Sequence, residues 1–248
     1  MILDAHLHLG YDYVFDKEQT EAELIEACEK YGVTGGIVQP LIPRPYIEDT
    51  MKIHNRIHKF CIDNPGRFWG MISMDPHFRP EDYEKEAKRC VNELGFVGIK
   101  ITPIAHAVHP ASKDAFTVYE IARSLDVPVM IHTGAGMPFS DPVSIIPAAE
   151  AFPDLKIVLA HAGQDLLSPQ ALYLAKTFKN VYLEPSWVNV LNIKNFISTI
   201  GATKIMFSSD MIPNTPVEIA KYKQAVKDPV QLEQIMYKTV KEVYRLKI

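Results

Sequence analysis

Residues 1–10 read MILDAHLHLG, an apolar run from 1 to 7 followed by a loop that opens at Gly10. Side chains two apart in a strand share a face, so His6 and His8 are expected to point the same way at the end of a first strand. A doubly wound nucleotide-binding sheet would carry a glycine-rich turn at this point. The stretch therefore favours a strand that ends in half of a metal site, with the remaining ligands elsewhere in the chain.

Short apolar segments recur along the chain and alternate with amphipathic helical segments. Eight such rounds in 248 residues predict an α/β fold of the (β/α)8 TIM barrel type. No linker-like composition and no internal repeat interrupts them, so residues 1–248 are expected to form one domain. The strands are expected at 2–7, 36–39, 68–73, 97–102, 127–132, 156–161, 180–184 and 204–209.

Several helix starts are marked by capping residues. Thr20 and Glu23 form a capping-box pattern ahead of an apolar stripe, and Pro229 begins a last helix. His54 and His58 are four residues apart on a further helix. They are expected on a solvated helix face, because separate apolar positions supply the core face and no third metal ligand is in sight.

Charge and composition exclude several classes of function. The chain has 26 Lys and Arg against 30 Asp and Glu, with no long run of either sign, so nucleic acid and anionic membranes are not expected partners. No apolar segment reaches the length of a membrane span, and the His-x-His pair stands where a signal peptide would have to be. Three widely spaced cysteines are typical of reduced thiols. We expect a cytoplasmic protein with a small-molecule substrate; the oligomeric state, a homo-oligomer included, is left open.

Residues of metal-binding type stand at the ends of five of the expected strands. In a barrel these ends meet at one face, where the active site lies. A polar side chain at the end of an apolar strand is costly unless it is bonded, so this coincidence indicates a metal centre rather than scattered rim residues. The residues are His6 and His8 on the first strand, Lys100 on the fourth, His132 on the fifth, His161 on the sixth and Asp210 on the eighth.

The motifs around these residues resemble those of the amidohydrolase superfamily, and more narrowly its amidohydrolase 2 branch of TIM-barrel metal-dependent hydrolases and related decarboxylases. They are Asp4-Ala5-His6-Leu7-His8-Leu9-Gly10, Gly98-Ile99-Lys100, Ile131-His132-Thr133-Gly134, Leu159-Ala160-His161-Ala162-Gly163 and Ser208-Ser209-Asp210. The resemblance implies one divalent metal ion, most often Zn²⁺, held by His6, His8, His132 and Asp210. His161 is then left as a general base or a substrate contact.

Lys100 leaves a second arrangement open. In binuclear relatives, the resemblance implies a carboxylated lysine that bridges two metal ions, with His132 and His161 holding the second ion. An unpaired ammonium group that faces the barrel interior is costly. Carboxylation would remove this cost, and so would pairing with Asp210 or Glu184. The sequence does not separate one metal ion from two.

The expected chemistry follows from the metal. A bound Zn²⁺ lowers the pKa of its water toward about 7 and polarises a carbonyl group. We expect hydrolysis of an amide, lactone or ester of a small organic molecule, with Asp210 passing the proton of the water to the leaving group and His161 assisting. The alternative is a non-oxidative decarboxylase, which the same branch supports with the same ligands. A minor alternative is a barrel that binds metal or ligand without turnover.

Further residues are expected to contact the substrate or to support the ligands. Asp4 is expected on the face of His6 and His8, one layer deeper, in a hydrogen bond behind the metal ligands. The expected substrate contacts are Arg44 in the loop after the second strand, His106 and His109 in the loop after the fourth, and Glu184 and Trp187 at and after the end of the seventh.

Overall fold

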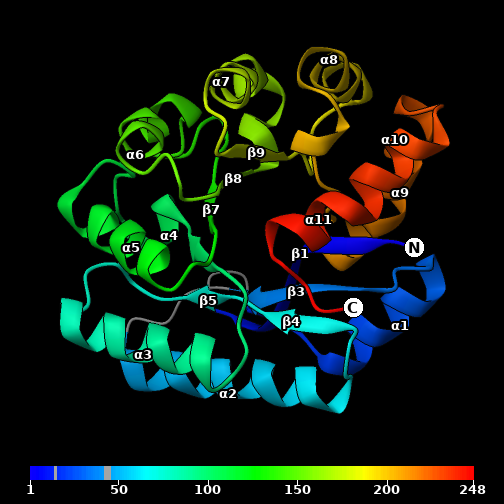
Figure 1. Cartoon of the computed structure of the whole chain (residues 1–248). Coiled ribbons are helices and arrows are strands. Elements are labelled where there is room, and N and C mark those ends of the chain that lie inside the picture. The colour runs from blue at the N-terminus through cyan, green and yellow to red at the C-terminus, as the bar shows by residue number, and fades with distance from the viewer. Residues whose placement is uncertain (14–15, 42–45) are drawn as a thin grey trace.

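The strands of the protein lie at the centre of the molecule, and the helices surround them (Figure 1). The structure is a computed structural model that describes residues 1–13, 16–41 and 46–248. The described strands are β1 (Leu3–Asp12), β2 (Lys17–Gln19), β3 (Gly35–Pro40), β4 (Phe68–Gly70), β5 (Ile72–Ser73), β6 (Ile99–Ile101), β7 (Val129–His132), β8 (Ile157–Ala160) and β9 (Val181–Glu184).

The helices form where the sequence predicts them. Thr20 caps α1 (Glu21–Tyr31), and its reciprocal bonds with Glu23 confirm the capping box. The last helical run begins at Pro229 as predicted, but a wider π-helical turn, η5 (Gln234–Lys238), separates α10 from α11. The other helices are α2 (Ile47–Asp63), α3 (Pro80–Asn92), α4 (Pro103–His106), α5 (Lys113–Ser124), α6 (Ile146–Ala151), α7 (Gln164–Thr177), α8 (Val190–Ile200), α9 (Thr215–Ala225), α10 (Pro229–Glu233) and α11 (Thr239–Val243), with short turns η1 (Pro142–Ile145), η2 (His161–Gly163), η3 (Ala202–Lys204) and η4 (Ile212–Asn214).

The strands form two parallel groups that together make the barrel wall. One runs in the order β1-β3-β4 and the other in the order β5-β6-β7-β8-β9, and β2 adds antiparallel to the end of β1. The predicted third strand is interrupted at Met71, whose backbone nitrogen still donates to Val38 O at 2.8 Å. The expected barrel is therefore confirmed. We call each of the eight positions in its wall a stave, and the third stave consists of two strands, β4 and β5.

The barrel closes through residues 204–209, which we call the closing segment. Its only bridge among the described residues joins Ile205 to Leu183 of β9. On its other side, Ala5 N of β1 donates to Phe207 O at 3.0 Å. The prediction of a regular eighth strand is wrong, because the backbone nitrogen of Phe207 donates at 3.0 Å to a carbonyl group of η5. The segment nevertheless fills the position between β9 and β1.

A bulge in β1 sets the direction of its side chains. Asp4 pairs with Gly36 of β3 and Leu7 pairs with Val38, so β1 carries one residue more than β3 between these two pairs. An extra residue of this kind shifts the alternation of side chains by one position. The two halves of β1 therefore present opposite sets of residues to the barrel interior.

The packing of β1 shows this change of face. Ala5, before the end of the bulge, packs in the core inside the barrel, whereas Leu7 packs in the core between strands and helices. His6 and His8 consequently face the interior at the carboxyl end of the strand. Asp4 lies on the other side of the bulge, so the expectation that it shares their face is wrong.

His54 is fully buried, which contradicts the expectation of a solvated helix face. Its Nδ1 lies 2.9 Å from Glu86 Oε1 on α3, and its Nε2 accepts from Ser73 N at 3.3 Å. His54, Glu86 and Cys90 converge as metal ligands do, but Arg89 donates to both oxygens of Glu86 at 2.7 and 2.8 Å. We therefore interpret the cluster as a polar core between α2 and α3.

Two further expectations concern the chain as a whole. Cys28, Cys61 and Cys90 are free thiols, as predicted. In the part of the chain that the structure describes, no helix combines the length and the apolar composition that crossing a membrane requires.

Candidate metal centre

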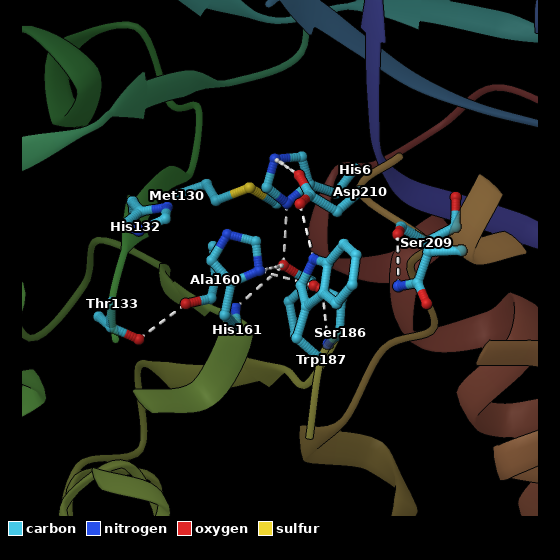
Figure 2. Close-up of polar contacts among 12 residues, drawn as sticks. His6, Met130, His132, Thr133, Ala160, His161, Ser186, Trp187, Ser209 and Asp210 are labelled. Carbon is cyan, nitrogen blue, oxygen red and sulfur yellow. Dashed lines mark hydrogen bonds and ion pairs between the residues drawn. The ribbon is translucent and has the colours of Figure 1, made fainter. Parts of the chain in front are cut away.

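Three predicted ligands converge at the carboxyl end of the barrel. Asp210 Oδ1 lies 3.2 Å from His6 Nε2 and 3.1 Å from His8 Nε2. All three ligand atoms lie within 4.8 Å of one another. Figure 2 shows the side chains of His6 and Asp210 next to one another. The structure thus brings two residues of β1 together with Asp210, which directly follows the closing segment.

The outer ring nitrogens decide which way the two histidines face. His8 Nδ1 lies 2.9 Å from Pro40 O, which can only accept, so this nitrogen carries the proton. His6 Nδ1 lies 2.9 Å from Glu184 Oε2 in the same manner. Burial lowers the pKa of His6 well below its usual value, so its ring is neutral. His6 Nε2 then presents a lone pair, and His8 Nε2 presents one in the neutral tautomer that the bond to Pro40 O selects.

Two lone pairs and a carboxylate oxygen that face one another repel unless a cation lies between them. Two imidazole nitrogens and one carboxylate oxygen are also the donor types that Zn²⁺ and Mn²⁺ accept in proteins. The residues therefore fit a divalent metal ion. His6, His8 and Asp210 would hold it, and coordination positions would remain for substrate or water.

Asp210 is fixed at both oxygens. Trp187 Nε1 donates to Oδ2 at 2.7 Å, and Figure 2 shows the indole nitrogen directed toward the carboxylate. The backbone nitrogen of Asp210 donates to His6 O at 2.9 Å. Burial alone would raise the pKa of Asp210, but His6, His161 and His8 hold it well below the usual value. The carboxylate is ionised and oriented before any metal ion binds.

Glu184 lies behind His6 and is fully buried. Its Oε2 accepts from His6 Nδ1 at 2.9 Å and from His161 N at 3.2 Å, while Oε1 accepts from Ser186 N at 2.9 Å. Burial raises its pKa above the usual value, although the bonds from Ser186 act in the opposite direction. Both oxygens are engaged by the protein. The predicted substrate contact by Glu184 has to compete with these bonds.

His161 and His132 lie beside one another next to this group, with ring centroids 4.6 Å apart. His161 Nδ1 lies 2.7 Å from Ser186 Oγ, and burial lowers its pKa to about 4. His132 Nε2 lies 3.2 Å from Met137 Sδ, and burial, with His161 and Lys100, lowers its pKa to about 2. Both rings are therefore neutral at pH 7. His161 forms a second converging group with His6 and Glu184; His132 belongs to neither group among the described residues.

Lys100 reaches the centre from β6. Its Nζ lies 3.2 Å from His6 Nε2 and 3.7 Å from Met130 Sδ, and its side chain is almost fully buried. Burial lowers its pKa below the usual value, and the charges of Asp210 and Glu184 oppose that change. Lys100 is thus an ammonium group beside the metal-facing atom of His6.

The predicted substrate contacts lie in different places. Trp187 is 46% exposed above Asp210, whereas His106 is buried in α4 with its Nδ1 accepting from Thr102 N at 3.1 Å. Burial lowers the pKa of His106 to about 3. His109 is exposed, with its ring centroid 6.0 Å from that of Phe139. Arg44 lies outside the described residues. Substrate contact by these side chains stays a prediction.

The structure confirms the predicted hydrogen bond of Asp4 behind the metal ligands, whereas sequence reasoning missed Ser209 and Ser186 as partners. Asp4 Oδ1 accepts from His6 N at 2.9 Å and from Ser209 N at 3.1 Å, and Asp4 Oδ2 accepts from Ser209 Oγ at 2.6 Å. Asp4 thereby ties β1 to the closing segment and sets His6 beside Asp210. The positions of Ser186 and Ser209 next to Glu184 and Asp210 were the available signals, but a serine there is equally typical of a turn.

Comparisons with known proteins identify the family of the chain. The sequence profile described as amidohydrolase (Amidohydro_2) matches residues 3–246. A 2-keto-4-carboxy-3-hexenedioate hydratase of Sphingobium sp. is 28% identical over 176 residues. That alignment covers 57% of this chain and 51% of the hydratase, so the chain spans about half the length of this relative.

Solved structures match almost the whole chain. A dihydroxybenzoic acid decarboxylase from Polaromonas sp., with bound manganese and the inhibitor 2-nitroresorcinol, has a TM-score of 0.79 at 17% identity and covers 99% of this chain and 97% of its own. A 4-oxalomesaconate hydratase from Rhodopseudomonas palustris has a TM-score of 0.75 at 19% identity, with 99% and 96% covered. At these identities the likeness establishes the fold, a single-domain TIM barrel. The profile match over residues 3–246 shows that the chain belongs to the amidohydrolase family, in its amidohydrolase 2 branch.

Proposed function

We propose that the protein is a metal-dependent lyase that decarboxylates a small carboxylic acid without an oxidant. The relatives described above are decarboxylases and hydratases, which are lyases, and this supports the decarboxylase alternative over the hydrolase expected first. Manganese is the first candidate metal because it is present in related structures, and zinc is the second. One ion held by His6, His8 and Asp210, with His132 as a fourth ligand, suits the donor set.

The observation that carries this proposal is the state of Asp210. A hydrolase of this kind needs the carboxylate to take a proton from the attacking water. Here Oδ1 faces His6 and His8, and Oδ2 accepts the indole N–H of Trp187 at 2.7 Å. The indole N–H occupies one acceptor position of Oδ2, and the pKa of Asp210 is held well below its usual value by His6, His161 and His8, so this carboxylate is a poor base for the attacking water. Decarboxylation needs no attacking water, so it makes no such demand.

The side chains then have separate roles. The bound metal supplies a Lewis acid that holds and polarises the substrate. The bond between the substrate carbon and its carboxylate breaks, carbon dioxide leaves, and a proton takes its place on that carbon. We assign proton delivery to His161, whose Nδ1 is fixed by Ser186 Oγ at 2.7 Å. Because burial lowers the pKa of His161 to about 4, its ring is neutral at pH 7 and has to take up a proton from solvent before it can deliver one to the carbon; the protonated ring is then a stronger acid than an ordinary imidazolium.

A second candidate is hydration of a carbon–carbon double bond. The 28% identical relative is a hydratase, and this supports the alternative. The two reactions differ in their products: a decarboxylase releases carbon dioxide, whereas a hydratase adds the elements of water and releases nothing.

The test is product analysis with protein loaded with Mn²⁺ and, separately, with Zn²⁺. The panel holds 2,6-dihydroxybenzoate, an unsaturated dicarboxylate, and an ester and a lactone of similar size. We expect carbon dioxide from a carboxylate substrate and no cleavage of the ester or lactone. Ester or lactone hydrolysis without carbon dioxide release would overturn the proposal, and water addition alone would favour the hydratase. His6→Ala, as the control, is expected to lose both bound metal and turnover.

A further inference from the structure

A layer of side chains lies inside the barrel next to the metal-facing atoms. Gln39 on β3, Lys100 on β6, Ala160 on β8 and Ser208 in the closing segment occupy equivalent positions on alternate staves, as the layers of a TIM barrel do. The residues two positions earlier on three of these staves, Ile37, Val158 and Met206, pack in the core inside the barrel, as does Ala160 itself. Since side chains two apart share a face, the layer points inward.

Each polar member of this layer adjoins one of the metal-facing residues. Gln39 is the register partner of His8 on the neighbouring strand. Lys100 Nζ lies 3.2 Å from His6 Nε2. Ser208 stands two residues before Asp210 in the chain. The layer therefore forms the floor of the candidate metal centre.

Two polar side chains of this floor, those of Gln39 and Ser208, have no hydrogen-bond partner among the described residues. Gln39 is 1% exposed and Ser208 is 0% exposed, and within the described part of the chain Gln39 Nε2, Gln39 Oε1 and Ser208 Oγ make no hydrogen bond. Leaving a buried polar group unsatisfied costs about 1 to 3 kcal/mol. A floor with three such atoms is thus suited to a polar occupant.

The chemistry of the floor indicates an anion. The Lys100 ammonium group has three N–H donors, but the described contacts of Nζ are His6 Nε2 and the weakly accepting sulfur of Met130. The Gln39 amide and the Ser208 hydroxyl add further donors. The charges of Asp210 and Glu184 act on Lys100, but neither carboxylate is among the described hydrogen-bond contacts of Nζ. An ammonium group in one layer with further donors is typical of a carboxylate-binding subsite.

This subsite favours one kind of carboxylate over another. Charge-assisted bonds stabilise a carboxylate in its ground state, which opposes its loss as carbon dioxide. A carboxylate bound in the floor is therefore one that the reaction leaves in place. The group that leaves has to lie elsewhere, on the metal side of the substrate.

We propose that Lys100, Gln39 and Ser208 bind a retained carboxylate, so that the substrate is a dicarboxylic acid. This inference rests on the proposed lyase function. The substrate spans from the metal ion, held by His6, His8 and Asp210, to the floor of the barrel. Lys100 acts here as a substrate-binding cation and not as a carboxylated bridge between two metal ions.

The experiment is ligand binding by titration calorimetry with manganese-loaded protein, which is independent of turnover. The probes are 2-hydroxyisophthalate against salicylate, and fumarate against crotonate, so that each pair differs by one carboxylate group. We expect at least one dicarboxylate to bind about tenfold more tightly than its monoacid, or better. Equal affinity within both pairs, or no dicarboxylate binding, would contradict the proposal.

Variants locate the effect. Gln39→Glu places a negative charge in the floor at nearly unchanged volume, and Lys100→Met removes the cation. Both are expected to reduce the preference for the dicarboxylate to about threefold or less. Gln231→Glu makes the same chemical change at an exposed position of α10 and is expected to keep the preference. If the floor holds only water, Gln39→Glu leaves the preference unchanged, and the proposal fails.

Two further measurements keep the test decisive. Manganese content is measured for every variant: loss of manganese in Lys100→Met, with the preference intact in Gln39→Glu, would make Lys100 a metal ligand and overturn the inference. If Lys100→Met does not fold, Gln39→Leu replaces it. Turnover separates the two proposals. If the protein decarboxylates monoacids, and Gln39→Glu does not change that activity, the result counts against the subsite alone. If the protein binds dicarboxylates but shows no lyase activity, the result counts against the proposed function alone.

Discussion

Glu184 Oε2 accepts a hydrogen bond from His6 Nδ1 across 2.9 Å, although 178 residues separate them in the chain. The bond fixes the ring so that Nε2 faces the metal position. Partners of this kind typically change metal affinity by roughly 10- to 100-fold when they are removed. Glu184→Gln is therefore expected to weaken Mn²⁺ binding by about that factor in a metal titration. Glu233→Gln, at an exposed position, is the control, and equal affinity in the two variants would show that the bond has no such role.

Two variants of Trp187 distinguish the role of its indole N–H, which donates to Asp210, from the role of its aromatic ring. Trp187→Phe keeps a ring but removes the donor at 2.7 Å from Oδ2. Hydrogen bonds to charged groups contribute about 1.5 to 3 kcal/mol, and the partly exposed position favours the lower figure. We expect about tenfold weaker Mn²⁺ binding in Trp187→Phe. Trp187→Leu, which also loses the ring, is expected to bind substrate more weakly still; unchanged metal affinity in both variants would argue against an orienting role.

His132 provides a test of the fourth ligand. Its Nε2 lies 3.2 Å from Met137 Sδ, so a metal ion that binds this nitrogen has to displace the sulfur contact. We expect His132→Ala to lower Mn²⁺ affinity by at least about tenfold, since a ligand is removed. Met137→Leu removes the competing sulfur and is expected to keep or raise the affinity. If His132→Ala binds Mn²⁺ as the unaltered protein does, the centre has three protein ligands alone, His6, His8 and Asp210.

His106 is expected to make the protein less stable in acid. Burial lowers its pKa from 6.5 to about 3, so between these values the unfolded chain binds a proton that the folded chain does not. Stability is therefore lost as the pH falls from about 6.5 toward 3. This residue accounts for about 2 to 3 kcal/mol of the loss between pH 7 and pH 4.5.

Urea unfolding of His106→Gln measures this contribution. The difference in unfolding free energy between the unaltered protein and the variant is expected to shrink by about 2 to 3 kcal/mol when the pH is lowered from 7 to 4.5. His109→Gln changes an exposed histidine of the same loop and is expected to leave the pH dependence as it is. A difference for His106→Gln that does not vary with pH would show that the residue is not buried in its neutral form.

The polar core around His54 predicts a local loss of stability. His54→Leu removes the bond to Glu86 at 2.9 Å but leaves the two bonds from Arg89. We expect a loss of about 2 kcal/mol in chemical denaturation, because the carboxylate stays partly paired. His58→Leu, with its partly buried ring, is the matched control and is expected to cost less. Metal content should not change in either variant, and a drop in His54→Leu would indicate a second metal site.

The sequence is sufficient to predict the barrel and the converging part of the centre. His6, His8 and Asp210 stand at the ends of staves that are adjacent once the barrel closes, so strand order alone brings them together. The bulge in β1 is different, because it depends on how β1 pairs with a strand about thirty residues away. For the same reason the burial of His54 against α3 is not visible from the spacing of residues on α2.

Side-chain contacts that depend on an unusual backbone conformation could not be predicted from the sequence either. Trp187 has a φ of 66° and Asp210 a φ of 66°, both in the left-handed region that non-glycine residues rarely adopt. The hydrogen bond between them results from these two turns. No pattern of residue types along the chain encodes such a pair, whereas the type of residue at a strand end can be found by inspection.

The bulge between Asp4 and Leu7 has a consequence for how this family can change. If the same residues ran in strict alternation, without the bulge, Leu7 and Leu9 would continue the inward face of Leu3 and Ala5, and both histidines would point toward the helices. The first strand would then resemble ordinary barrel packing, although its sequence was unchanged. Whether this barrel presents its histidines to a metal ion is therefore decided by the pairing register of one strand as much as by the chemistry of its residues.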